Sequence, residues 1–159
     1  MRKGYNVPIW STFIIILIAL DQLTKFLIVK SLEVGESRKV ISNFLYITSH
    51  RNQGAAWGIL QGKMWLFYIV TIVVLVILFM FFKNEGYGRP DVQLGLSLLI
   101  AGSIGNFIDR LFRGEVVDFV DTYIFSYNFP IFNVADAALT IGVIVLIIVI
   151  LFEGKEEKA

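Results

Sequence analysis

The side chains best able to do chemistry in this sequence are carboxylates. The chain has no cysteine and a single histidine, His50, which excludes thiolate nucleophiles, cysteine-ligated zinc and a histidine-rich metal site within one chain. A pairing of Lys25 with Ser49, Ser103 or Ser126 is conceivable, but no spacing favours it. Acidic residues are plentiful in the second half of the chain, at Asp109, Glu115, Asp118, Asp121 and Asp136.

A pair of carboxylates is sufficient to hydrolyse an amide without a metal. Two carboxyl groups held close together cannot both ionise, so one of them keeps its proton. The ionised member takes a proton from water, and the protonated member polarises the peptide carbonyl. Residue types and spacing leave open which two carboxylates form such a pair.

Four segments of the chain are long and apolar enough to cross a membrane, which takes about 20 mainly apolar residues. They cover residues 9–29, 64–82, 92–108 and 134–152. Segment 64–82 has no polar face for water, which argues against a soluble helical bundle. The first segment is followed by Asp-Gln-Leu-Thr-Lys instead of a small-residue cleavage site, and is therefore predicted to be a retained helix.

Polar residues of these spans gather at one membrane surface. Because successive spans alternate in direction, the end of the first and third and the start of the second and fourth meet on the same side. The residues at those positions are Asp21, Thr24, Lys25, Asn52, Gln53, Asn106, Asp109, Arg110, Asn133 and Asp136. The two longer connections, 30–63 and 109–133, lie on that side too. Ionisable residues in membrane helices usually face the bundle interior and mark a functional site.

Structural roles explain some of these residues equally well. Asn133 can cap the last helix, and Asp136 can favour the positive end of the same helix. Asp21 and Lys25 are four residues apart and can form an ion pair on one helix face.

Lysine and arginine are divided almost evenly between the two membrane faces, so charge alone does not decide which face is cytoplasmic. The net charge of +1 gives no indication of nucleic-acid binding.

Five blocks of the sequence together resemble one family, the bacterial lipoprotein signal peptidases (signal peptidase II). The blocks are Asp21-Gln-Leu-Thr-Lys25, Arg51-Asn-Gln-Gly-Ala-Ala-Trp-Gly58, Gly105-Asn-Phe-Ile-Asp-Arg110, Gly114-Glu-Val-Val-Asp-Phe119 and Phe132-Asn-Val-Ala-Asp136. They appear in the order typical of the family and span nearly the whole chain. One departure is Ala101-Gly102, where many members have two glycines, and it concerns helix packing only.

The resemblance implies a site and a reaction. Asp118 and Asp136 match the catalytic dyad of a metal-independent aspartic endopeptidase without cofactor, which leaves Asp121 a bystander. The positions that match residues shaping the site or holding substrate are Asp21, Lys25, Asn52, Gly54, Asn106, Asp109, Arg110, Asn133 and Ala135. The implied substrate is a diacylglyceryl-modified prolipoprotein, cut just before its lipid-bearing cysteine.

The expected fold is an all-α integral membrane protein, a single membrane domain over residues 1–159 with four transmembrane helices. The strand-like run Lys39–Thr48 is expected to form part of a small extracytoplasmic β-rich cradle, and Val117–Pro130 a flap-like loop or helix. The resemblance implies a monomer in the bacterial cell membrane, surrounded by membrane lipid, with cytoplasmic termini and an outward-facing site. It also implies inhibition by globomycin-type cyclic peptides.

Three other functions are compatible with carboxylates at the ends of membrane spans. A transporter would need polar groups near the membrane midplane, which the middles of the second and fourth spans lack. A magnesium-dependent lipid transferase would use Asp118 and Asp121 with a substrate phosphate. A structural membrane subunit would tolerate the loss of either member of the dyad.

Overall fold

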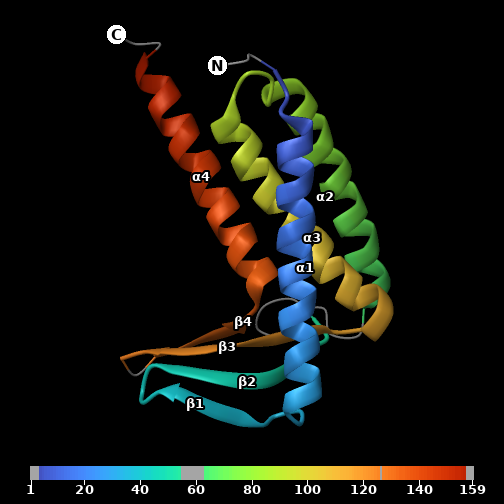
Figure 1. Cartoon of the computed structure of the whole chain (residues 1–159), viewed down its shortest axis with the longest axis vertical. Helices are drawn as coiled ribbons and strands as arrows, with labels where there is room; N and C mark the ends of the chain where they lie inside the picture. The colour runs from blue at the N-terminus through green and yellow to red at the C-terminus, as the bar shows by residue number, and fades with distance from the viewer. Residues whose placement is uncertain (1–3, 55–62, 126, 157–159) are drawn as a thin grey trace.

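The computed structural model describes residues 4–54, 63–125 and 127–156. In that part of the chain the elements follow the order α1 (Val7–Ser31), β1 (Ser37–Ile41), β2 (Leu45–Asn52), α2 (Met64–Glu85), α3 (Pro90–Arg113), β3 (Val116–Ile124), β4 (Tyr127–Phe132) and α4 (Val134–Glu156). The helices run side by side, the strands lie across one end of them, and both chain ends lie at the other end (Figure 1).

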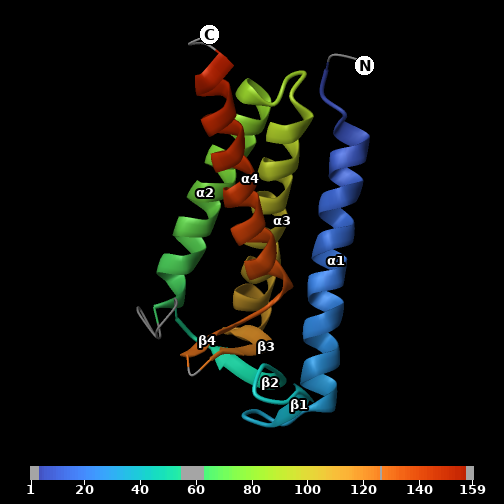
Figure 2. The same ribbon diagram turned by 90° about the vertical axis from the view of Figure 1, so that its left-hand side faces the viewer.

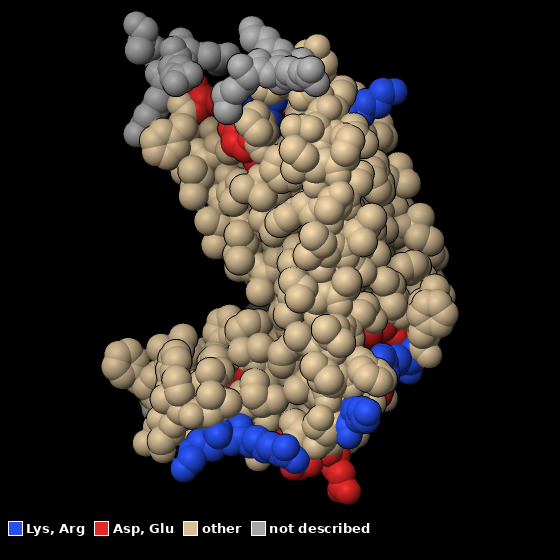
Figure 3. All heavy atoms as spheres, viewed as in Figure 1, with Lys and Arg blue, Asp and Glu red and all other residues tan. Residues whose placement is uncertain are grey.

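All four described helices are long and apolar enough to cross a membrane. The predicted spans each fall within one of them. Helix α3 is the least hydrophobic, with a mean hydropathy of 1.3 against 2.9 for α2 and α4, and it is also the most buried. Helix α3 packs against α1, α2 and α4 and therefore forms the centre of the bundle (Figure 2). On the face seen in Figure 3, charged side chains gather toward the two ends of the molecule, with an uncharged band between them.

Helices α3 and α4 approach each other closely because glycines face glycines or backbone. A Cβ on Gly102 would lie 2.5 Å from the carbonyl oxygen of Ala135, and a Cβ on Gly142 would lie 2.9 Å from that of Gly95. No side chain fits in either place, so these glycines are packing positions that allow the two helices to come together. This contact fixes the start of α4 against the last turns of α3.

The four strands form one antiparallel sheet in the order β1-β2-β3-β4. Strands β2 and β3 are far apart in the chain, yet their pairing places His50 opposite Asp118. Helix α3 ends at Gly114, whose φ of 72° is the left-handed conformation that allows the chain to turn directly into β3. The sheet therefore begins immediately beside the end of the central helix.

This sheet corrects two expectations. The strand-like run Lys39–Thr48 does contain strand, namely the last three residues of β1 and the first half of β2, but the fold is not all-α. The segment Val117–Pro130, expected to be a flap-like loop or helix, forms β3 and β4. Its strand character is hidden in the sequence because the first residues of β3 are buried on both faces and show no polar alternation.

Candidate active site

Asp136 lies in the first turn of α4 and takes part in the cap of that helix. Its backbone N–H donates to Oδ1 of Asn133 at 2.9 Å, and the backbone N–H of Asn133 donates to Oδ2 of Asp136 at 3.1 Å. This reciprocal arrangement is a capping box. Asn106 Nδ2 donates to the other carboxylate oxygen, Oδ1, at 2.7 Å. The capping role predicted for Asn133 and Asp136 is therefore real, and it orients a carboxylate that lines a pocket.

Asp118 lies on β3 and is almost completely buried. Asn133 Nδ2 donates to its Oδ1 at 2.7 Å, and Asn52 Nδ2 donates to its Oδ2 at 3.1 Å. Burial, followed by the nearby charge of Asp136, raises the pKa of Asp118 to about 7, while the two asparagine amides act in the opposite direction. Asp118 is therefore poised to gain or lose a proton near neutral pH.

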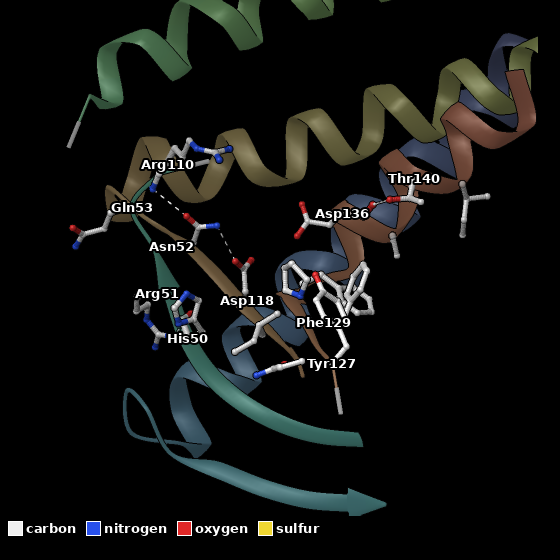
Figure 4. A pocket seen from close by; sticks show the side chains of 17 residues that line it. His50, Arg51, Asn52, Gln53, Arg110, Asp118, Tyr127, Phe129, Asp136 and Thr140 are labelled. Carbon is white, nitrogen blue, oxygen red and sulfur yellow. Dashed lines mark hydrogen bonds between the residues drawn. The ribbon is translucent and has the colours of Figure 1, made fainter. Parts of the chain in front are cut away.

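One asparagine holds both carboxylates. Asn133 is fully buried, and it binds Asp136 through its backbone and Asp118 through its side-chain amide. Asp118 from β3 and Asp136 from α4 face the same pocket (Figure 4). The pocket has a volume of about 1040 Å³, and it corresponds to the hollow between α4 and the sheet (Figure 3).

A buried lysine lies behind this pair. The side chain of Lys25, on α1, has no exposed surface, and its ammonium group contacts Asp21 Oδ2 at 2.9 Å and Asp109 Oδ2 at 3.3 Å. It also donates to Asn106 Oδ1 at 3.0 Å. Asp109 makes a second ion pair with Arg113 at 3.3 Å, so two cations balance two carboxylates. The predicted i, i+4 pair of Asp21 and Lys25 is thus confirmed, as one part of a larger network.

The two carboxylates of this network also hold the elements that carry Asp118 and Asp136. Asp21 Oδ1 accepts the backbone N–H of Ala135 at 2.9 Å, in the first turn of α4. Asp109 Oδ2 accepts the backbone N–H of Val117 at 3.1 Å, one residue before Asp118. The network centred on Lys25 therefore ties α1, α3, β3 and α4 together at one level.

The family model described as "Signal peptidase (SPase) II" matches residues 13–152 of the chain. The chain belongs to the signal peptidase II family. It is 56% identical over 158 residues to the "Lipoprotein signal peptidase" of Staphylococcus carnosus (strain TM300), covering 99% of each chain. It is 53% identical over 158 residues to that of Staphylococcus haemolyticus (strain JCSC1435), covering 99% of this chain and 100% of the relative.

Two solved structures share the fold of this chain. A bacterial membrane enzyme determined by the in meso method at 2.3 Å resolution superposes with a TM-score of 0.93 at 49% identity, over 98% of this chain and 95% of that one. Another, determined at 1.9 Å resolution, gives a TM-score of 0.89 at 51% identity, over 95% and 97%. The fold of this chain is therefore also that of these two bacterial membrane enzymes.

The residues singled out by resemblance to signal peptidase II lie together. The hydrogen bonds and ion pairs given above join nine of these residues, which are Asp21, Lys25, Asn52, Asn106, Asp109, Asp118, Asn133, Ala135 and Asp136. The N–H of Gly54 donates to Asn52 Oδ1 at 3.0 Å. Arg110 lines the pocket and lies over the ring of Phe67, 4.7 Å from its centroid.

Other sequence candidates lie elsewhere. Asp121 does not line the pocket, and its Oδ2 accepts the hydroxyl of Thr48 at 2.7 Å. The ammonium group of Lys25 contacts Asp21, Asp109 and Asn106, so a Ser–Lys pair has no support among the described residues. Ser126 and residues 55–58 of the second sequence block lie outside the described residues. The described residues also contain no group of three or more His, Asp or Glu that could hold a metal ion.

Sequence reasoning missed part of the pocket wall. Thr140 lines the pocket from α4, and Phe129 and Pro130 line it from β4. Thr140 comes four residues after Asp136, so helical spacing alone puts it on the same face, and that signal was available. The β4 residues gave no comparable signal, because their position depends on a sheet that pairs distant segments.

Proposed function

We propose that this chain removes the signal peptide from diacylglyceryl-modified prolipoproteins and cuts just before the lipid-bearing cysteine. The observation that carries the proposal is the pair of carboxylates, Asp118 and Asp136, that face one pocket from two elements and are both bound by Asn133. Membership of the signal peptidase II family, and relatives named lipoprotein signal peptidase, support the same substrate class.

The depth of the pair fits this substrate. A signal peptide is an apolar helix, and a lipid on the residue after the scissile bond keeps that bond at the membrane surface. Asp136 lies two residues after the first residue of α4, which is about 3 Å along the axis at 1.5 Å per residue. A carboxylate at this depth reaches a peptide bond at the boundary between hydrocarbon and water.

The proposed reaction is general acid–base hydrolysis with one shared proton. We assign the proton to Asp118, because its pKa is raised to about 7. Asp136 takes a proton from water, the resulting hydroxide attacks the scissile carbonyl carbon, and Asp118 donates its proton to the carbonyl oxygen. When the tetrahedral intermediate collapses, the leaving amine takes the proton held by Asp136, and Asp118 regains its own. No metal or cofactor takes part.

Other elements of the proposal concern the surroundings of the reaction. Arg110 lies at the pocket wall. Its guanidinium N–H groups are suited to bind a peptide carbonyl of the substrate or an ester oxygen of its diacylglyceryl group. The termini are cytoplasmic and the pocket opens on the outer face of the cell membrane. The enzyme works as a monomer in membrane lipid, and a globomycin-type cyclic peptide competes for the same pocket.

Two segments are proposed to respond to substrate. The hairpin of β1 and β2 rests on the membrane and cradles the substrate, and the hairpin of β3 and β4 covers the pocket as a flap. Hydrogen exchange with and without a globomycin-type inhibitor tests both roles. Slower exchange in both hairpins is the expected result, and unchanged exchange in both would remove these roles from the proposal.

The function is tested by cleavage of a lipid-modified precursor by purified variants. Asp118→Asn and Asp136→Asn should each lower the cleavage rate by about 10²–10⁴-fold, while the protein still inserts into the membrane and accumulates. Asp121→Asn is the matched control, because Asp121 is buried and lies on β3 like Asp118 but does not line the pocket.

The rival functions predict different results in the same assay. A magnesium-dependent transferase would lose activity with Asp121→Asn and with EDTA, whereas the peptidase should keep its rate in EDTA. A structural subunit would tolerate all three substitutions. Full turnover by pure Asp136→Asn protein would end the dyad proposal.

A further inference from the structure

A second groove lies at the end of the bundle farthest from the candidate active site, between α1 and α2. It has a volume of about 340 Å³, with Trp10 and Ile14 of α1 on one wall and Phe79 of α2 on the other. Helices α1 and α2 each pack against α3, and Ile100 of α3, only 1% exposed, forms the floor. The groove therefore has two walls and a floor, all within the membrane-spanning part of the chain.

The shape of the groove suits a hydrocarbon chain. Trp10 and Ile14 are four residues apart on α1, which is about 6 Å along the helix axis, and Phe79 and Lys83 are equally spaced on α2. The groove thus runs along the helices, in the direction of lipid acyl chains. Apart from its rim, its lining is mainly aromatic and aliphatic, which excludes a polar occupant from its length.

The rim of the groove is positively charged. The hydroxyl of Tyr5 donates to the backbone carbonyl of Lys83, and the Tyr5 ring stacks on Phe82 at 6.4 Å, which holds the start of α1 against the end of α2. The ammonium group of Lys83 has no carboxylate within ion-pair distance in the described part of the chain, whereas nearby Arg89 pairs with Glu153. An unpaired cation at the membrane surface attracts anionic lipid headgroups.

One further polar group lies in the groove wall. The indole Nε1 of Trp10 is buried and has no acceptor among the described residues. Trp10 is about one helical turn below the rim, at the level where tryptophan side chains sit between headgroups and hydrocarbon. The ester carbonyl oxygens of a phospholipid lie at this level and are suitable acceptors for that N–H.

We propose that this groove binds one phospholipid with an anionic headgroup, from the leaflet on the side of the chain termini. The phosphate pairs with Lys83, an ester oxygen accepts from Trp10, and one acyl chain lies along Ile14 and Phe79 over Ile100. This site lies at the opposite end of the helices from Asp118 and Asp136, so it goes beyond the proposed function and does not depend on it.

Quenching of Trp10 fluorescence by brominated lipid tests the site directly. Replacing Trp57 and Trp65 by Phe leaves Trp10 as the single indole of the chain. The detergent-purified protein is titrated with phosphatidylglycerol brominated on its acyl chains and, in parallel, with brominated phosphatidylcholine. The anionic lipid should reach half-maximal quenching at an about fivefold lower concentration, as expected for one lysine near a phosphate.

Two variants and one control locate the binding. Lys83→Gln should remove the preference for phosphatidylglycerol, and Ser11→Phe, which fills the groove, should reduce quenching by both lipids. Lys63→Gln makes the same change of charge at the other end of α2 and should keep the preference. Circular dichroism verifies that each variant is folded. Equal quenching by the two lipids, a preference that survives Lys83→Gln, or undiminished quenching in folded Ser11→Phe protein would each overturn the proposal.

Discussion

Replacement of Lys25 by methionine should destabilise the folded protein strongly, because it leaves buried carboxylates without their cation. Methionine has a similar length and no charge, so the change removes the ion pairs to Asp21 and Asp109 with little change in packing. The network then carries a net charge of −1, since Arg113 balances only Asp109.

The magnitude follows from the distances. At 2.9 and 3.3 Å, and with an effective dielectric constant of about 20, each pair contributes roughly 5 kcal/mol of attraction. The cost of desolvating the ammonium group offsets much of this sum in the native protein. Breaking a buried pair from one side typically costs about 3–5 kcal/mol, and we expect Lys25→Met to lie in that range.

The assay is unfolding in mixed micelles of detergent and a denaturing surfactant, followed by circular dichroism. The double variant Lys25→Met with Asp21→Asn removes the unpaired charge, and the new amide oxygen still accepts the N–H of Ala135. It should therefore be more stable than Lys25→Met alone. Lys63→Met changes an exposed lysine and should shift the free energy of unfolding by less than about 0.5 kcal/mol.

The comparison of the single and double variants decides the matter. The electrostatic account of this network would be wrong if Lys25→Met were as stable as the native protein. It would also be wrong if adding Asp21→Asn lowered the free energy of unfolding further, as an independent second substitution would.

Four further predictions concern the site. The processing rate should fall as pH rises through about 7, because Asp118, whose pKa is raised by burial and by its charged neighbour, then loses the shared proton; a rate that stays level from pH 6 to 9 would contradict this. The same raised pKa means that the native state binds more protons than the unfolded state between about pH 4 and 7, so the free energy of unfolding should decline across that range. Asn52→Ala removes a hydrogen bond that lowers the pKa of Asp118, so the alkaline limb of the pH–rate profile should move to higher pH, whatever the change in maximal rate. Gly105→Ala places a Cβ 2.7 Å from Asp21 Oδ2 and should cost about 1–3 kcal/mol in the same unfolding assay, whereas Gly4→Ala, with no atom within 4 Å of its Cβ, should be neutral.

The four helices could be predicted from sequence because a membrane span needs only a long apolar run. The convergence of polar residues at one surface followed from the alternating direction of the spans. Lys25 shows the limit of this reasoning: its partner four residues earlier was predictable, but Asn106 and Asp109 are about eighty residues away, and only the packing of α1 on α3 brings them together.

The sheet was predicted only in part, for a physical reason. The exposed strand β1 and its partner β2 have a strand-like composition and a turn between them. Strand β3 begins with Val116, Val117, Asp118 and Phe119, all buried, so neither a helical nor an alternating pattern appears. Its conformation is fixed by pairing with β2 and β4, which residue order alone does not reveal.

The capping box at the start of α4 has a consequence for the way this enzyme fails. Asp136 helps to close the first turn of its own helix. The position of this proposed catalytic carboxylate therefore depends on that turn remaining helical. Fraying of this single turn would separate the two carboxylates while most of the helical backbone remained intact. On gradual warming, turnover should therefore disappear before the far-ultraviolet signal of the bundle declines.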